Sequence, residues 1–324
     1  MKDKCDVYEI FIATLQEKVP AKKTLVNLLS SMLVLDKEAI YRRLRGIVPF
    51  TFADIMTVSK ELNISLDSIT GATSVRSFPF EMRMFDCIFM ENNYEPLQNY
   101  LEYLKSLLPS PISEASFASS FLPLHFLMTY HQIHRLLVLK WSYQFNSLQK
   151  LKSFSETILS ERHILLCRKI RAIFYNVEYT CFIWNELTIL YLINDIKYFY
   201  SIRIINMEEV NLIKQDLLLF IADLEKMANT GMFHTGKRVD IYVSNLNFET
   251  SYSYFISGNT KLTFVRSTTF DDAFSSNHDV FNFIYSWIHS LKRTSVLISV
   301  CNTMQRIEFF DEQRKLVEEN LMIS

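Results

Sequence analysis

Glycine is scarce in this chain, and its distribution restricts both the fold and the chemistry. Five glycines occur in 324 residues, at positions 46, 71, 231, 236 and 258. They form no Gly-x-Gly pattern, no Gly-x-Ser-x-Gly pattern and no complete Gly-x-x-x-x-Gly-Lys-Ser/Thr motif. Phosphate-binding loops and nucleophile elbows need such glycines, because only glycine lets the backbone approach the ligand or turn so sharply. The sequence therefore argues against nucleotide-dependent enzymes and against α/β hydrolases.

The positions of glycine and proline along the chain predict three parts, residues 1–71, 78–230 and 231–324. The middle part contains no glycine and, after Pro123, no proline. Its apolar residues recur three and four positions apart, which is typical of packed helices. The helices expected there cover 94–108, 124–150, 155–175, 178–203 and a last one that begins with a capping box at Asn206 and ends at Gly231. We expect this part to be an all-helical bundle or a degenerate helical repeat.

The last part changes its periodicity from helical to alternating. Three alternating runs, 238–248, 251–256 and 261–265, predict an antiparallel meander, with turn residues between the second and third runs. A helix is expected at 279–292 and another at 303–320, whereas 295–299 fits either a strand or a helix. The predicted fold class is therefore mainly α, with a small C-terminal α+β unit that contains the meander.

Cysteine usage and hydropathy indicate the compartment. The five cysteines are scattered and form no Cys-x-x-Cys pair, as expected of free thiols in a reducing compartment. The first residues lack the apolar core of a signal peptide, and the apolar run at 181–200 is interrupted by polar and charged residues. We expect a cytoplasmic protein that does not enter a membrane.

Residues 33–67 carry the clearest functional pattern. Asp36 has the position of an N-cap for a short helix that ends before Gly46. Thr51 and Asp54 have capping-box spacing at the start of a second amphipathic helix, and an Asn-Ile-Ser-Leu-Asp corner follows at 63–67. This order of capped helices is typical of a helix-turn-helix that reads DNA.

The charge of this region differs from that of the whole chain. The net charge of the chain is −1, whereas residues 22–45 contain six cations and two acids, an excess of four. Ile40 and Leu44 lie one helical turn apart and should face the core. Their positions leave five side chains on the outer and flanking faces of the helix: Lys37, Glu38, Tyr41, Arg42 and Arg45. Lys22 and Lys23, at the preceding helix, suit contacts with DNA phosphates.

Over roughly residues 22–69 the chain resembles the lambda-repressor/Cro-like helix-turn-helix family of transcriptional regulators. The resemblance implies that the helix starting near Asp36 is the recognition helix. It places Lys37, Glu38 and Tyr41 at base-contacting positions, and Arg42 and Arg45 at groove-edge or phosphate positions. Ser30 fits the small residue needed where the two helices cross. Two residues depart from the pattern: Val34 stands where the turn favours glycine, and Arg43 stands where the family has an apolar residue.

These observations predict a sequence-specific DNA-binding transcriptional regulator that is not an enzyme. Its partners would be double-stranded DNA and a second copy of the chain, with helix 36–45 in the major groove at each half of a palindromic site. Residues 78–230 would serve for dimerisation or for sensing a small-molecule or protein effector. The alternative is an interaction scaffold that uses the helix-turn-helix to dock a protein. A third hypothesis is an enzyme in residues 231–324 that the first domain regulates.

Other polar clusters are weaker candidates for chemistry. His131 and His134 could share a helix face, but no third ligand and no His-Glu-x-x-His motif accompany them, and His125 and His163 lie elsewhere. We therefore predict no metal site and no cofactor. The loop residues Asp271, Asp272, His278 and Asp279 are more typical of helix caps than of an acid–base pair, so no catalytic residue is predicted. The many aromatic residues of 72–324 could line a ligand pocket.

Overall fold

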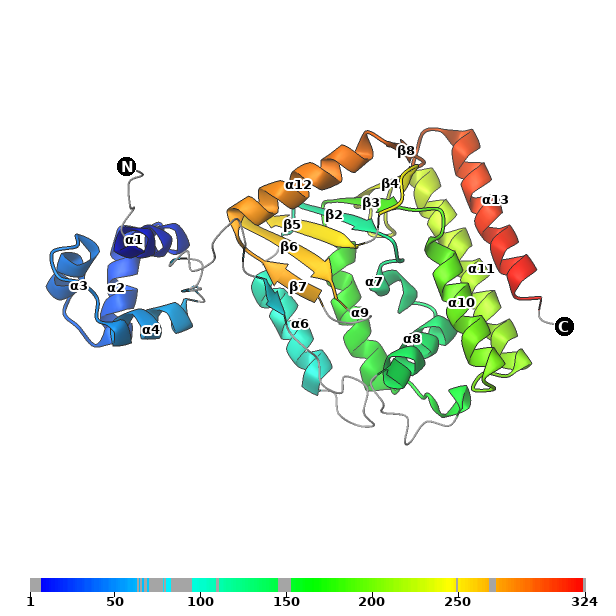
Figure 1. Cartoon of the computed structure of the whole chain (residues 1–324), viewed down its shortest axis with the longest axis horizontal. Helices are drawn as coiled ribbons and strands as arrows, with labels where there is room; N and C mark the ends of the chain where they lie inside the picture. The colour runs from blue at the N-terminus through cyan, green and yellow to red at the C-terminus, as the bar shows by residue number, and fades with distance from the viewer. Residues whose placement is uncertain are drawn as a thin grey trace. The chain divides into compact units, whose positions relative to one another are not determined.

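The computed structural model describes residues 7–62, 64, 66, 69, 78, 80–82, 95–108, 111–144, 153–248, 250–267 and 272–322. The chain divides into two compact units, Met1–Pro79 and Phe80–Ser324 (Figure 1). The predicted boundary after residue 71 is close to this division. The predicted boundary at residue 230 lies inside the second unit.

The described part of the first unit consists of four helices, α1 (Val7–Lys18), α2 (Lys22–Leu33), α3 (Lys37–Leu44) and α4 (Phe52–Glu61). Two of them begin as predicted. Asp36 Oδ1 accepts a hydrogen bond from Ala39 N (2.7 Å), and Thr51 forms a capping box with Asp54. The helices enclose one apolar core: Phe11, Leu15, Leu25, Val26, Leu29, Ile40, Phe50, Val58, Ile64 and Ile69. This core holds α3 against α2 and leaves the opposite face of α3 to solvent.

The second unit is built on one mixed sheet, with eight strands among the described residues. These are β1 (Glu81–Met82), β2 (Glu114–Ser119), β3 (Tyr179–Trp184), β4 (Arg238–Ser244), β5 (Tyr252–Ser257), β6 (Thr260–Arg266), β7 (Asp272–Ser275) and β8 (Ser295–Leu297). Their order across the sheet is β1-β7-β6-β5-β2-β3-β4-β8. The central strands β2, β3 and β4 run parallel, and the flanking pairs are antiparallel.

Helices fill the connections between the parallel strands, as such crossovers require. The chain from β2 to β3 forms α7 (Leu124–Leu127), α8 (His131–Gln144), the short 3₁₀ helix η2 (Phe154–Glu156) and α9 (Glu161–Tyr175). The chain from β3 to β4 forms α10 (Thr188–Ser201) and α11 (Met207–Thr230). The remaining helices are α6 (Glu95–Leu107), α12 (His278–Lys292) and α13 (Thr303–Asn320).

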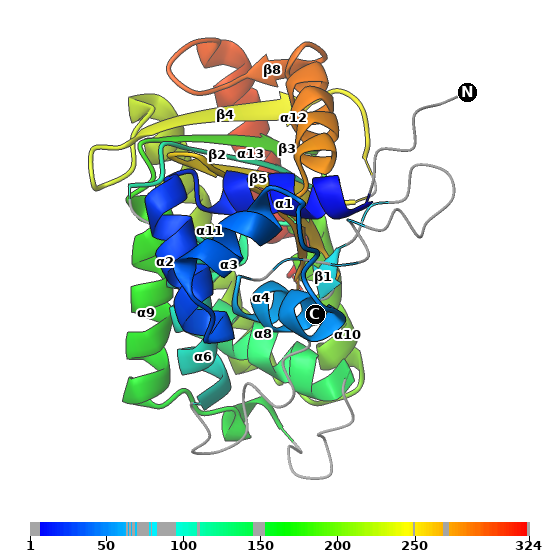
Figure 2. The same cartoon turned by 90° about the vertical axis from the view of Figure 1, so that its left-hand side faces the viewer.

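Alternate residues of the central strands face two separate cores. Phe117 and Phe182 pack into the larger core, which the sheet shares with α6 to α11 and α13. Ala118 and Ile183 pack into the smaller core with α12. Figures 1 and 2 show α12 against one face of the sheet and the remaining helices of the second unit on the opposite face. The parallel strands are thus covered on both faces, which is usual for such sheets.

The expectation of an all-helical middle part and a separate small α+β unit is wrong. β2 and β3 arise from the middle part and occupy the centre of a sheet that continues into the strands of residues 238–297. β3 falls in a predicted helix, because a strand buried on both faces is a continuous apolar run that periodicity does not distinguish from a buried helix. The three alternating runs are strands, but β2 and β3 separate β4 from β5, so the first run is not part of the meander.

Several local predictions for the second unit are confirmed. Asn206 and Glu209 form the capping box of α11, and Gly231 ends that helix in the left-handed conformation (φ 64°). The helix α13 spans the predicted residues 303–320. At 295–299, where either a strand or a helix was possible, residues 295–297 form the strand β8. In the described part of the chain, no helix combines the length and the apolar character needed to cross a membrane.

Candidate nucleic-acid interface

The turn between α2 and α3 sets the direction of α3. Val34 adopts the left-handed conformation (φ 55°, ψ 43°), which explains why a glycine is favoured at such a turn. Ser30 Oγ donates a hydrogen bond to Leu35 O (2.5 Å), and Leu35 N donates to Ser30 O (3.2 Å). The hydroxyl and the main-chain oxygen of Ser30 therefore both bond to Leu35, which holds the turn against the last turn of α2.

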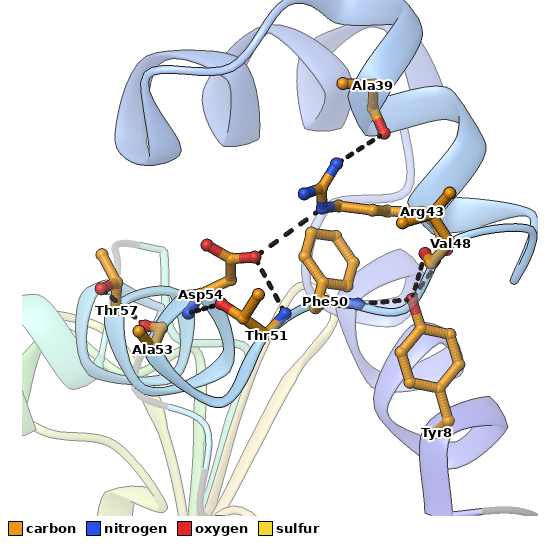
Figure 3. A network of polar contacts seen from close by, with 9 residues as sticks. All are labelled: Tyr8, Ala39, Arg43, Val48, Phe50, Thr51, Ala53, Asp54 and Thr57. Carbon is orange, nitrogen blue, oxygen red and sulfur yellow. Dashed lines mark hydrogen bonds and ion pairs between the residues drawn. The ribbon is translucent and has the colours of Figure 1, made fainter.

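Arg43, the second departure from the family pattern, points toward α4 (Figure 3). Its Nη1 donates to Ala39 O (3.4 Å), and its Nε lies 3.7 Å from Asp54 Oδ2, close enough for an ion pair. Asp54 Oδ2 also accepts from Thr51 N (2.9 Å), so one carboxylate both caps α4 and pairs with α3. Both side chains of the ion pair are partly buried. Arg43 therefore replaces the expected apolar contact with a polar one that joins the two helices.

Tyr8 of α1 bonds to the backbone at the C-terminal end of α3 and in the loop that follows (Figure 3). Its hydroxyl donates to Arg43 O (2.9 Å) and accepts from Phe50 N (3.2 Å). Burial raises the pKa of the Tyr8 phenol, which keeps its proton for this donation. The C-terminal end of α3 is thus tied to α1, to α4 and to the loop between α3 and α4.

Most of the predicted DNA-contacting side chains are exposed. Lys37, Glu38, Arg42 and Arg45 project into solvent, and none forms an ion pair with another described residue. Tyr41 differs, because it is half-buried against the core of the first unit, and the Arg45 guanidinium lies 5.8 Å from its ring centre. Tyr41 therefore presents only part of its ring.

Lys22 and Lys23 are exposed in the first turn of α2. The N-cap residue Ala21 supplies no side-chain hydrogen bond, and no acidic residue lies in this first turn. Two lysines at an uncapped N-terminus oppose the helix dipole, which favours negative charge there. The combination leaves donor groups and positive charge available to an anion at the same helix end.

Comparison with known protein families, curated proteins and solved structures gave no match.

The glycine-rich segment of the second unit is a turn. Residues 231–237 have the glycine and lysine spacing of a phosphate-binding loop, but Arg238 replaces the Ser or Thr that would bind a metal ion. The segment also follows helix α11 and precedes strand β4, the reverse of the strand–loop–helix order of such loops. Lys237 Nζ instead pairs with Glu178 Oε1 (2.6 Å).

The acidic loop cluster has structural roles where it is described. Asp272 Oδ1 pairs with Arg266 Nε (2.6 Å), which joins β7 to β6. His278 and Asp279 are exposed in the first turn of α12, which Asn277 caps. Asp271 lies outside the described residues. The described members of the cluster therefore do not converge on a common point.

The second unit contains a cavity of about 660 Å³ beside the C-terminal end of β2. Its wall is mostly apolar and comes from α6 to α10, from the strands β2, β5, β6 and β7, and from the loops beside them. His125, which the sequence sets apart from the pair His131 and His134, lines this cavity although only 7% of its surface is exposed. The His125 ring stacks on Phe174 at 4.5 Å, and its Nε2 has no hydrogen-bond partner among the described residues. Burial lowers the pKa of His125 to about 3, so the ring is neutral.

His131 and His134, which could share a helix face, lie in different environments. His131 is exposed, whereas His134 is buried. His134 lies instead against His163 and Cys167 of α9. The sequence contained a signal for this arrangement, because His163 and Cys167 are four residues apart and share a helix face.

Proposed function

We propose that this chain is a sequence-specific DNA-binding transcriptional regulator that inserts α3 into the major groove. The observation that carries the proposal is that the cations of α3 and of its C-cap residue Arg45 differ in their contacts. Arg43 is engaged within the first unit, whereas Lys37, Arg42 and Arg45 are exposed and have no ion-pair partner among the described residues. An ordinary solvated helix face needs no such rigid support from three neighbouring elements.

The exposed side chains suit different parts of a DNA site. Lys37 and Glu38 occupy the first turn of α3, the end of a recognition helix that reaches base edges. Arg42 has the five donors needed to bind a guanine at two atoms. Arg45 and the pair Lys22 and Lys23 suit phosphates, which position the protein without specifying a sequence. We further propose that the protein acts in the cytoplasm as a homodimer on a palindromic site.

The proposal is tested by measuring the affinity of the full chain for genomic DNA upstream of its own gene and for random DNA, over a series of salt concentrations. Arg42→Ala should weaken binding to the specific site by about 1–3 kcal/mol and relax its specificity. Lys22→Ala should weaken binding to both DNAs and reduce the slope of log affinity against log salt by about 1.

The matched control is Arg168→Ala, which removes one exposed arginine from α9 of the second unit. This variant should bind like the wild type. Equal affinity of the wild-type chain for upstream and random DNA would refute sequence-specific recognition.

A second candidate function is protein docking by the first unit. It is favoured by the exposed apolar side chains Val34, Ile47 and Phe52. A docking module would show no salt-dependent affinity for DNA. It would also capture a protein partner that is lost when Tyr41 on α3 is replaced.

We also propose that the cavity of the second unit binds a small effector with a largely apolar body. The mostly apolar wall and the volume of about 660 Å³ support this proposal. Replacing Leu137, a wall residue of α8, with Trp should fill the cavity and abolish binding of an apolar fluorescent dye. Unchanged dye binding by Leu137→Trp would place the dye elsewhere and contradict the proposal.

A further inference from the structure

Three potential metal ligands converge between α8 and α9 in the second unit. His134 comes from α8, and His163 and Cys167 come from successive turns of α9. The two Nε2 atoms are 3.1 Å apart, and Cys167 Sγ lies 3.5 Å from His163 Nε2 and 3.9 Å from His134 Nε2. All three side chains are buried, with exposed fractions of 2%, 6% and 2% for His134, His163 and Cys167.

These separations match the spacing of ligands around one metal ion. With metal–nitrogen bonds of about 2.0 Å and metal–sulfur bonds of about 2.3 Å, angles of roughly 100–120° place the ligand atoms about 3.1–3.8 Å apart. The observed separations span 3.1 to 3.9 Å. The three ligand atoms are therefore close enough together to bind one ion.

A hydrogen bond between the two imidazoles is the simplest competing explanation. A neutral Nε2–H of one ring can donate to the Nε2 of the other at 3.1 Å, and this contact needs no metal. The Cys167 thiol can join the same network as a weak donor, because its Sγ lies within hydrogen-bonding distance of both Nε2 atoms. Only a metal site requires the Cys167 thiolate as a ligand. The two explanations predict different roles for Cys167, so a cysteine substitution separates them.

The surroundings of the cluster restrict the charge of the ion. Among the described residues, the group of converging His, Cys, Asp and Glu side chains contains no carboxylate. A thiolate with a divalent ion would leave a net positive charge buried among apolar residues such as Leu166 and Ile170, near the Arg171 guanidinium. A monovalent ion with the thiolate is neutral, and burial then costs far less. Soft thiolate ligands select Cu(I), zinc and iron–sulfur clusters, and of these Cu(I) is the monovalent ion.

We propose that His134, His163 and Cys167 form a three-coordinate His₂Cys site for Cu(I). Each histidine binds through Nε2, and Cys167 binds as a thiolate through Sγ. The Cys167 thiol loses its proton to solvent as the copper–sulfur bond forms, so one proton is released for each Cu(I) bound and no electron is transferred.

The test is a titration of the metal-free full chain with Cu(I), under anaerobic and reducing conditions, against a chromophoric Cu(I) chelator. We expect one Cu(I) per chain and an X-ray absorption spectrum with one sulfur and two nitrogen neighbours. Cys167→Ser, a nearly isosteric change, and His134→Asn should each weaken binding by more than the roughly 10- to 100-fold typical of changes beyond the ligand shell.

The controls are Cys181→Ser, which alters another buried thiol, Cys301→Ser, which alters an exposed thiol, and His131→Asn, which alters an exposed histidine of the same helix. All three should retain the wild-type affinity, and circular dichroism should verify that every variant is folded. Equal Cu(I) affinity of wild type, Cys167→Ser and His134→Asn would overturn the site. Displacement of Cu(I) by an equal concentration of Zn(II) would overturn the choice of a monovalent ion.

Discussion

Val34 provides a direct test of how the turn before α3 is maintained. Its left-handed conformation costs an L-residue about 1–2 kcal/mol, and its β-branched side chain makes relief through side-chain rotation difficult. The side chain is 90% exposed, so its removal loses almost no buried apolar area. Glycine relieves the strain but gives up about 0.5–1 kcal/mol, because it is more flexible in the unfolded chain. We therefore expect Val34→Gly to stabilise the first unit by about 0.5–1 kcal/mol.

Amide hydrogen exchange across residues 25–44 measures this change in the full chain, because it reports the opening free energy of the first unit. All three tryptophans (Trp141, Trp184 and Trp287) lie in the second unit, so their fluorescence serves as an internal control and should not change. Val34→Ala is the matched variant. It keeps the Cβ atom that causes the strain, and it should gain less than Val34→Gly. Faster exchange in Val34→Gly than in wild type would refute the reasoning.

Two further predictions concern the polar side chains of Arg43 and His125. Arg43→Met keeps the apolar stem of the side chain but removes the ion pair with Asp54. It should destabilise the first unit by about 1 kcal/mol, measured by amide hydrogen exchange. An unchanged exchange rate would mean that the ion pair does not stabilise the unit. His125 stays neutral in the folded protein down to about pH 3, whereas in the unfolded chain it gains a proton below about pH 6.5. Because only the unfolded chain binds this proton between these values, the free energy of unfolding decreases as the pH falls through that range. In His125→Phe, the loss of stability between pH 7 and pH 5 should be smaller by about 2 kcal/mol in urea unfolding followed by tryptophan fluorescence. Exposed His131→Gln is the control, and an equal loss in wild type and His125→Phe would contradict the shift.

The helices of the first unit could be predicted because their signals are local. A cap such as Asp36 or Thr51 acts on backbone groups three residues away, and the apolar period of one helix identifies its buried face. The sheet of the second unit could not be predicted in this way. Phe117 of β2 lies beside Phe182 of β3 only after about sixty intervening residues have folded into helices. No local pattern records that pairing, and the strands themselves lack the alternation of a half-exposed sheet.

The candidate sites also divide into parts that a local pattern predicts and parts that depend on the packed structure. The exposed residues of α3 follow from helix periodicity around Ile40, so their positions could be predicted. The role of Arg43 depends on Asp54 in another helix and on Tyr8 in a third, and a single helix pattern contains no information about either. The cluster of His134, His163 and Cys167 is intermediate. Its α9 half is visible as a spacing of four residues, whereas the contribution of α8 requires the packed structure.

The proposed copper site and the proposed effector cavity share two helices. On α8, the cavity residue Leu137 follows His134 by three positions, and on α9 the cavity residue Ile170 follows Cys167 by three positions. Residues three apart lie on neighbouring parts of one helix face, so bonds that fix α8 to α9 also constrain the cavity wall. Linkage then requires reciprocity: the factor by which Cu(I) changes effector affinity must equal the factor by which the effector changes Cu(I) affinity. The second unit would thus respond to both ligands through one pair of helices.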